Sequence, residues 1–258
     1  MIRAWVFLWL LTGCASTPEP VPEPRPDAPS TLSRASVMDG NLAGLNLSLT
    51  PFSHLGRSVS PVRAELLAAE QRYLPYLLKT TLTESGFWGA VRVTPSIDVT
   101  AELNCQGQLL SASAAELQVQ LICRDALGKL WLDDRFDTRI APDAYLQAGV
   151  DGRDPYRPVM VRIANRLADG LASFTDEDRR RLRDAALLRY AQTLSPEGFD
   201  GYLAVDAEGL MQVQGLPASS DPMVARVQRI RDSEYQFIDA MDEQYRLIYQ
   251  QMNVPYRL

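Results

Sequence analysis

The chain has 258 residues, of which 46% are hydrophobic and 22% charged, and its formal net charge is −6. This composition is typical of a globular protein with enough apolar residues for a sizeable core, in one medium domain or two small ones. The acidic balance argues against a general nucleic-acid binder, because phosphate contacts need a basic surface. Beyond the first residues, no window approaches 18 consecutive apolar residues, so we expect no membrane-spanning helix there.

The first residues have the layout of a secretory signal. Arg3 is followed by eight apolar residues at positions 4–11, and then by small or polar residues. A positive start, a short apolar segment and a small-residue cleavage site define such a signal. Eight apolar residues are far fewer than the roughly 20 that a spanning helix needs. We therefore expect export of the chain rather than a transmembrane anchor.

The four residues Leu11-Thr12-Gly13-Cys14 resemble a bacterial lipobox. The resemblance implies that residues 1–13 are a lipoprotein signal peptide and that Cys14 is diacylated and begins the mature chain. Acyl chains contribute ~0.8 kcal/mol per buried CH₂ and hold a folded domain on a membrane. Because an alanine follows the cysteine, the resemblance also implies the periplasmic face of the outer membrane. The alternative is a chance cysteine in an ordinary signal peptide.

Residues 14–42 are predicted to be the lipid anchor and a proline-rich spacer. Six prolines fall within residues 15–30, among Glu, Ser and Ala, and such a segment does not form a core. In a polyproline II conformation of ~3.1 Å per residue it reaches at most about 50 Å. The spacer would hold the folded part of the chain away from the membrane.

Residues 43–174 are predicted to form an α/β domain that begins with a strand and a helix. In residues 43–52, three leucines alternate with polar residues, the period of a half-buried strand. In residues 61–85, apolar residues recur at spacings of three and four, which predicts an amphipathic helix. Pro75 should kink or split this helix, because proline removes a main-chain donor and crowds the preceding turn. Gly86 is a natural helix stop.

Two adjacent predicted strands carry the pair of cysteines beyond the N-terminus. Residues 99–110 and 116–125 alternate between apolar and polar, and Cys105 and Cys123 fall on the apolar faces of their strands. An antiparallel register in which facing residue numbers sum to 228 along the whole hairpin places the two cysteines opposite each other, within disulfide distance. We predict a structural Cys105–Cys123 disulfide, which suits an oxidising compartment. Two free thiols or half of a metal site are the alternatives.

A third predicted strand, residues 130–138, follows a turn at Gly128. Leu130, Leu132 and Phe136 are expected to face inward, and the residues between them outward. Three acids on this strand could form a cation site or a pair of catalytic acids, but interleaved arginines favour a solvated strand face. These acids are Asp133, Asp134 and Asp137.

The chain then becomes mainly helical. Residues 156–174 are predicted to form a helix capped by Asp154, and Thr175 opens another helix whose first turn is acidic. Residues 175–258 are predicted to be a mainly helical C-terminal region with a small hairpin at residues 202–213.

The last predicted element is a long helix, residues 222–252, with apolar residues recurring along one side. At 1.5 Å per residue it is ~45 Å long and can extend past a small domain. The apolar stripe either packs on its own domain or binds a partner or a second copy, and both interpretations stay open. The candidate partner-binding residues are Ile230, Phe237, Met241, Tyr245 and Ile248.

The order strand, helix, three strands, helix resembles the α/β domain at the amino end of TolB and in CsgG-like periplasmic lipoproteins. The resemblance is one of pattern, and it rests on LNLSLTPF (45–52), LLKTTLTESGFWGAVRVTP (77–95), the hairpins of residues 98–136 and DPYRPVMVRIANRLADGL (154–171). It implies an α+β fold, with a small mixed or antiparallel sheet and helices packed on one face. It also implies a role in envelope assembly or secretion without catalysis.

The sequence contains no motif for metal, cofactor or catalysis. His54 is the only histidine and no Cys-x-x-Cys spacing occurs, so we expect no metal and no cofactor. The patterns GxSxG, HExxH, GxGxxG and the P-loop are absent. A Ser-His-Asp triad would have to use His54, which lies in a predicted loop.

Three functions are weighed against these features. The favoured one is a non-enzymatic scaffold or partner-binding component of a cell-envelope assembly or export system. Its partner would be another protein or a second copy of the chain, and not nucleic acid. The alternatives are a carrier of an apolar ligand and a cell-wall or polysaccharide hydrolase.

Overall fold

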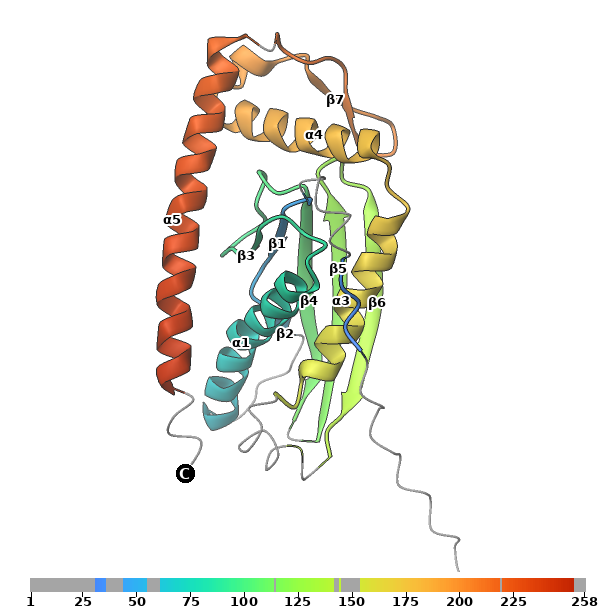
Figure 1. Ribbon diagram of the computed structural model, residues 1–258, viewed down its shortest axis with the longest axis vertical. Coiled ribbons are helices and arrows are strands. Elements are labelled where there is room, and N and C mark those ends of the chain that lie inside the picture. The colour runs from blue at the N-terminus through green and yellow to red at the C-terminus, as the bar shows by residue number, and fades with distance from the viewer. Residues whose placement is uncertain are drawn as a thin grey trace, which may run out of the picture.

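The computed structural model describes residues 31–35, 44–54, 61–113, 115–141, 144, 154–218 and 220–252. The predicted signal peptide, Cys14 and most of the predicted spacer lie outside these residues. The fold class is α+β, as predicted: a mixed six-stranded sheet carries helices, and further helices follow it (Figure 1). No helix in the described part of the chain is long and apolar enough to cross a membrane.

Strands and helices are interspersed up to residue 139, and helices predominate after it. They are β1 (Leu47–Leu49), β2 (Ser53–His54), α1 (Pro61–Ser85), β3 (Val91–Val93), β4 (Leu103–Ala112), β5 (Glu116–Asp125), β6 (Leu130–Arg139), α3 (Arg157–Ala172), α4 (Asp176–Leu194), the short 3₁₀ helix η2 (Glu197–Phe199), β7 (Leu203–Val205), β8 (Met211–Val213) and α5 (Pro222–Met252).

The main sheet has the order β3-β1-β4-β5-β6, and β2 pairs with β4 beside this path. Strand β1 is parallel to both β3 and β4, whereas β4, β5 and β6 form an antiparallel meander. The helix α1 lies between β2 and β3 along the chain, which is the long crossover that parallel strands require. The separate pair β7–β8 forms the predicted small hairpin, and Gly209 in its turn has a φ of +82°.

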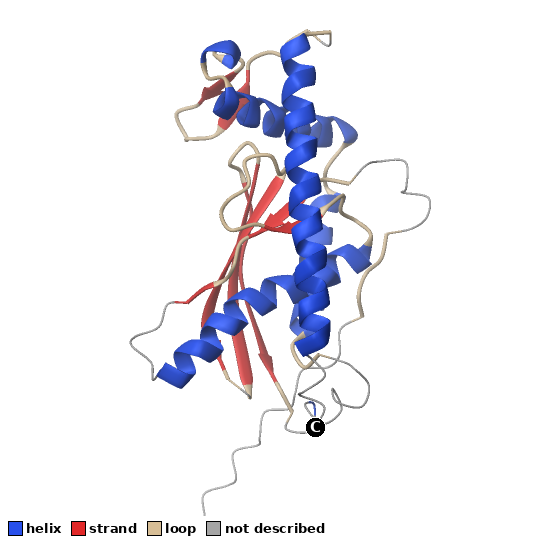
Figure 2. Ribbon diagram, turned by 90° about the vertical axis from the view of Figure 1, so that its left-hand side faces the viewer, coloured by secondary structure: helices blue, strands red, loops and turns tan. Residues whose placement is uncertain are grey.

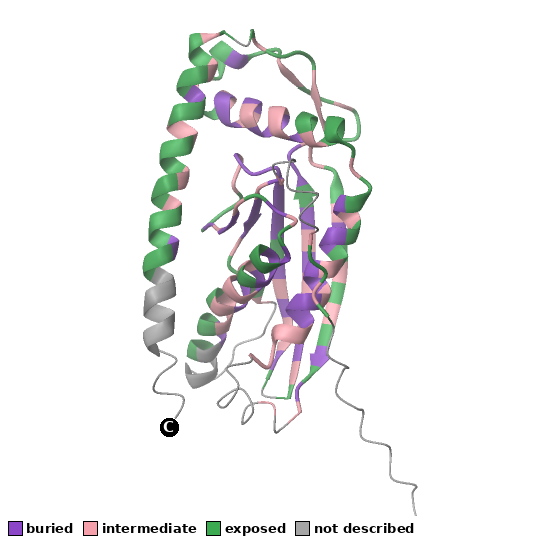
Figure 3. Ribbon diagram, in the orientation of Figure 1, coloured by how far each residue is buried: buried purple, intermediate pink, exposed green. Residues whose placement is uncertain are grey.

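Helices α1 and α3 cover one face of the main sheet, as predicted (Figure 2). Their buried residues and the inward residues of β4 and β5 form one core, in which side chains such as Leu78, Leu121 and Met160 are fully buried. On the strands, buried and less buried residues alternate (Figure 3). The opposite face is therefore polar and carries exposed residues such as Gln106. One apolar and one polar face is the expected arrangement for an antiparallel meander.

The C-terminal helices surround the end and one edge of the sheet (Figure 1). Helix α4 crosses the end of the sheet, begins at the Thr175 cap predicted from the sequence, and packs on the β7–β8 hairpin. Thr175 and Asp178 form a reciprocal capping box, which satisfies main-chain N–H groups at the start of the helix. Helix α5 then returns along the side of the molecule, beside α1 and the edge strand β3.

The predicted disulfide is present, but the predicted register holds for only part of the hairpin. Cys105 and Cys123 face each other, with an S–S distance of 2.00 Å and a Cα–Cα distance of 4.1 Å. From Leu103 to Leu109 the facing residue numbers sum to 228, but beyond a bulge Ser111 faces Gln118. A bulge adds one residue to one strand, and alternation of side chains alone does not reveal it.

A second bulge corrects the prediction for β6. Arg124 faces Leu130 and Cys123 faces Leu132, so Trp131 is the additional residue of the strand. Leu130 is therefore 44% exposed and not inward as predicted, whereas Leu132 is buried. Trp131 instead packs on Phe174, with ring centroids 4.3 Å apart.

Several predicted boundaries are also wrong. The strand expected to start at residue 99 starts at Leu103, because residues 99–102 form turns. Pro75 lies inside a continuous α1 and does not split it. Asp154 is not the N-cap of α3, a position held by Tyr156; its carboxylate accepts a hydrogen bond from the Tyr156 main chain at 2.7 Å. His54 lies in the short strand β2 and not in a loop.

Candidate interaction surface on helix α5

Helix α5 begins where the sequence places it. Asp221 precedes it and accepts a hydrogen bond from the main-chain N–H of Met223 at 2.8 Å, while Pro222 occupies the first helical position. Among its residues with described side chains, only Val227 and Asp242 are buried. A helix so little buried by its own domain is held by a few specific contacts.

The first of these contacts joins α5 to the edge strand β3. The guanidinium of Arg92 donates to both carboxylate oxygens of Asp239, at 2.8 Å each, and lies 3.8 Å from the centroid of the Tyr235 ring. The Tyr235 hydroxyl is hydrogen-bonded to that of Thr100 at 2.6 Å. Burial raises the pKa of Tyr235 to about 12, so the phenol stays neutral at physiological pH.

The second contact joins α5 to α1. The carboxylate of Asp242 accepts a hydrogen bond from the Tyr76 hydroxyl at 2.8 Å and another from the Lys79 ammonium. Asp242 is only 8% exposed, so the lysine and the tyrosine replace the water that the carboxylate loses. These ionic contacts show that α5 docks on its own domain, which is the first of the two interpretations that the sequence left open.

A buried acid lies where α4 and α5 meet the sheet. The carboxylate of Glu102 accepts a hydrogen bond from the main-chain N–H of Asn46 at 2.6 Å and is 2% exposed. Burial raises the pKa of Glu102, and the positive charges of Arg231 on α5 and Arg183 on α4 partly oppose this shift. Glu102 is therefore a buried acid near positive charges from both C-terminal helices.

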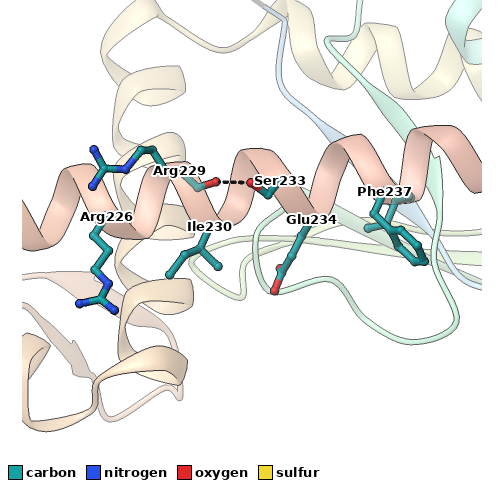
Figure 4. A pocket seen from close by; sticks show the side chains of 7 residues that line it. Arg226, Arg229, Ile230, Ser233, Glu234 and Phe237 are labelled. Carbon is teal, nitrogen blue, oxygen red and sulfur yellow. Dashed lines mark hydrogen bonds between the residues drawn. The ribbon is translucent and has the colours of Figure 1, made fainter.

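One side of α5 carries apolar side chains beside a groove. Phe237 is 69% and Met241 42% exposed. Ile230, seven residues before Phe237, is half-buried and packs against the cluster that contains Leu188 of α4 and Val227. Figure 4 shows Arg226, Ile230, Glu234 and Phe237 projecting to the same side of the helix. The groove has a volume of about 700 Å³, and its lining is Arg226, Arg229, Ile230, Ser233, Glu234, Phe237 and Ile238.

Two cations at this groove were not among the predicted site residues. Arg226 and Arg229 are exposed, and neither forms an ion pair with any described residue. Spacing is the signal that could have identified Arg226, which lies four residues before Ile230, since residues three or four apart share a helix face. Arg229 in turn lies three residues after Arg226. We call Arg226, Arg229, Ile230, Phe237 and Met241 the outer strip of α5.

The remaining predicted site residues are placed as follows. Tyr245 and Ile248 belong to α5, but their side chains lie outside the described part. Cys105 and Cys123 form a disulfide buried in the core and offer no exposed thiol. Cys14 lies outside the described residues.

The described residues also bear on metal and hydrolase chemistry. They contain no group of three or more His, Cys, Asp or Glu side chains that could hold a metal ion. The Nδ1 atom of His54 lies 3.2 Å from the Leu109 carbonyl, and the Ser53 hydroxyl donates to the Gly107 carbonyl at 3.4 Å. Both side chains thus contact the main chain of β4 and do not form a nucleophile–base pair.

Comparison with known proteins gives little likeness. No protein family and no curated protein matches the sequence. Among solved structures, a PelC dodecamer from Paraburkholderia phytofirmans is 11% identical, with a TM-score of 0.34 over 55% of this chain and 96% of that one. The hypothetical protein CT253 from Chlamydia trachomatis is 12% identical, with a TM-score of 0.27 over 52% of this chain and 98% of that one. Likenesses of this size carry no functional argument.

Proposed function

We propose that this chain is a non-enzymatic scaffold lipoprotein on the periplasmic face of the outer membrane, anchored through Cys14. In this proposal the outer strip of α5 binds a protein partner within a cell-envelope assembly or export system. The resemblance of Leu11-Thr12-Gly13-Cys14 to a lipobox and the proline-rich segment after it support the anchor and its reach.

The observation that carries the proposal is the exposure of Phe237 on a helix that ion pairs hold to its own domain. Single exposed apolar residues are ordinary, but Phe237 and Met241 are both exposed and lie one turn apart. Phe237 also lines the groove, as does Ile230 two turns earlier. Covering a Phe side chain contributes about 1.5–3 kcal/mol. The ion pairs of Asp239 and Asp242 lie on another side of α5 and leave Phe237 and Met241 exposed.

The strip specifies the chemistry of its partner. Apolar side chains of an amphipathic helix would cover Phe237 and Met241, in the manner of helix-in-groove recognition. A carboxylate two or three turns along that helix would meet Arg226 and Arg229, which have no ion-pair partner among the described residues. We therefore assign the partner as an amphipathic helix with an acidic end, on another envelope protein.

Site-specific photo-cross-linking in intact envelopes tests this assignment. A photoreactive residue in place of Phe237 should form an adduct with one partner, and the same residue in place of Gln236, which is exposed on another side of α5, should not. Adding Arg226→Glu and Arg229→Glu to the Phe237 variant should reduce that adduct at least ~10-fold, because like charges then face each other.

The outcomes distinguish specific docking from nonspecific association. Equal adducts from positions 236 and 237, or an adduct indifferent to the two charge reversals, would overturn the proposal. Phe237→Ala is the folding control: the side chain is exposed, so its thermal midpoint should match that of the wild type.

A carrier of an apolar ligand is the second candidate, and the volume of the α5 groove is the observation that favours it. About 700 Å³ falls within the usual range of ligand sites. However, two arginines and Glu234 line the groove, whereas carrier sites bury most of their ligand among apolar groups. Native mass spectrometry of the purified chain would reveal a bound lipid, and Phe237→Ala should then release it.

A further inference from the structure

The outer edge of β6 is a long strand edge without a partner among the described elements. Strand β6 has ten residues and pairs with β5 on one side, at the end of the sheet. The opposite edge strand, β3, has α5 beside it. An open edge offers main-chain donors and acceptors to another strand.

The hydrogen bonds of β6 show which peptide groups point outward. The N–H of Ile140 donates to the Ala115 carbonyl at 2.9 Å, so even-numbered residues direct their peptide groups toward β5. Odd-numbered residues from 133 to 139 therefore direct theirs to the free edge. In agreement, Arg162 of α3 donates to the main-chain carbonyl of Asp137. A carbonyl oxygen has two lone pairs, so this bond leaves room for a bond between strands.

The same four odd positions carry charges of alternating sign. They are Asp133, Arg135, Asp137 and Arg139, and all four are exposed. Edge strands that only need to stay unpaired are commonly blocked by charged side chains, lysine above all. Alternating signs are different, because they can complement a second copy of the same strand.

We propose that two copies of this chain associate through their β6 edges, antiparallel, about a two-fold axis at Phe136. In this register facing residue numbers sum to 272, so Arg135 faces Asp137 of the second copy and Asp133 faces Arg139 of the second copy. The facing positions are those whose peptide groups point outward, which gives about eight main-chain hydrogen bonds across the seam. The sheet then continues from one copy into the other.

Charge selects this register over its neighbours. Sliding the two strands by two residues places Arg135 against Arg135 or Asp137 against Asp137 of the second copy, and facing like charges destabilise a strand pair. Sliding the two strands by one residue would place the outward peptide groups of one copy opposite the inward peptide groups of the other. It would also bring the side chains of the two copies to opposite faces of the joined sheet. The interface is isologous, as a closed dimer requires. It does not depend on α5 or on the partner proposed for it.

Sedimentation velocity of the full-length chain in detergent tests the dimer. Arg135→Asp alone, and Asp137→Arg alone, should each weaken dimerisation at least ~10-fold, since each creates two like-charge pairs about the axis. The double swap Arg135→Asp/Asp137→Arg should return the dissociation constant to within ~3-fold of the wild type, because opposite charges face each other again. Gln106→Arg is the matched control, exposed on the same sheet face but two strands inward, and should change nothing.

Disulfide trapping tests the register itself. Mixing an Arg135→Cys chain with an Asp137→Cys chain that carries a different tag should give a cross-linked heterodimer, because facing Cα atoms in such a pair lie ~5.5 Å apart. Gln106→Cys in place of either variant should give none. A wild-type chain that is monomeric at every concentration would overturn the proposal, as would a dimer that tolerates single reversals or is not restored by the swap.

Discussion

Arg92 and Asp239 form a two-point ion pair that joins the edge strand of the sheet to the C-terminal helix, 147 residues further along the chain. The arginine side chain is 9% exposed and the aspartate 54%. The guanidinium also stacks on Tyr235, which makes the contact specific for arginine. With Asp242 it fixes the rotation of α5 on the domain, and so decides which side of the helix faces outward.

Asp239→Asn should loosen α5 without unfolding the sheet. The substitution leaves a buried guanidinium short of its carboxylate, at a cost of about 1–2 kcal/mol, between the values for exposed and buried pairs. Amide hydrogen exchange should become faster along α5 and stay unchanged in β4 and β5. Glu177→Gln, which removes the solvent-exposed pair with Arg180, is the control and should cost under ~0.5 kcal/mol. Unchanged exchange in α5 would show that the Arg92–Asp239 ion pair does not hold the helix to the domain.

Replacing both core cysteines by alanine should lower the free energy of unfolding by about 3 kcal/mol, because the disulfide closes a loop with a sequence separation of 18. Urea titrations with and without reductant measure this. Reductant should lower the midpoint of the wild type and have no effect on Cys105→Ala/Cys123→Ala. Equal midpoints for the oxidised wild type and the double variant would show that the bond contributes little.

Gly107→Ala should destabilise the sheet by about 2 kcal/mol through overpacking. A Cβ at this position would lie 2.3 Å from the ring of Phe52, whose side chain is 2% exposed and has no space to move into. Gly215→Ala is the matched control, since nothing lies within 4 Å of the added Cβ. Thermal midpoints should fall for the first variant only, and adding Phe52→Leu should recover part of the loss.

Glu102→Gln should change how stability depends on pH. Burial raises the pKa of Glu102 above its ordinary value of 4.5, so the folded protein binds the proton more tightly than the unfolded chain. Its contribution is therefore favourable at low pH and is lost as the pH rises from about 4.5 through the folded pKa. The stability of Glu102→Gln relative to the wild type should thus increase with pH across this window. Glu208→Gln, on an exposed turn, is the control for removing a carboxylate charge.

Cys14→Ser should abolish acylation. In cells fed an alkyne-labelled fatty acid, the wild type should take up label and fractionate with the outer membrane, and the variant should do neither. The Cys105→Ala/Cys123→Ala chain should keep its label, since those residues form a disulfide. A label that survives Cys14→Ser would contradict the predicted anchor.

Local patterns in the sequence determined several features of this protein. The bounds of α5 follow from a proline start and a continuous helical period, and the Thr175 cap follows from acids after a threonine. The facing of Cys105 and Cys123 follows from parity, because strand residues alternate with a fixed period of two. These signals are local, so the residues that carry them lie within a few positions or on adjacent strands.

The tertiary structure alone decided how those elements meet. Two bulges, one before Ser111 and one at Trp131, shift the pairing of their strands by one residue. The alternation of apolar and polar residues in the sequence does not reveal such a shift. The bulge at Trp131 is the reason that Leu130 is exposed. The apolar stripe of α5 gave no sign that ion pairs with Arg92 and Lys79, far away in the chain, hold the helix to its domain. Periodicity identifies an apolar face, but only packing in three dimensions determines what that face contacts. In α5, the polar contacts with β3 and α1 determine which side of the helix faces the domain, and Phe237 is left exposed to water.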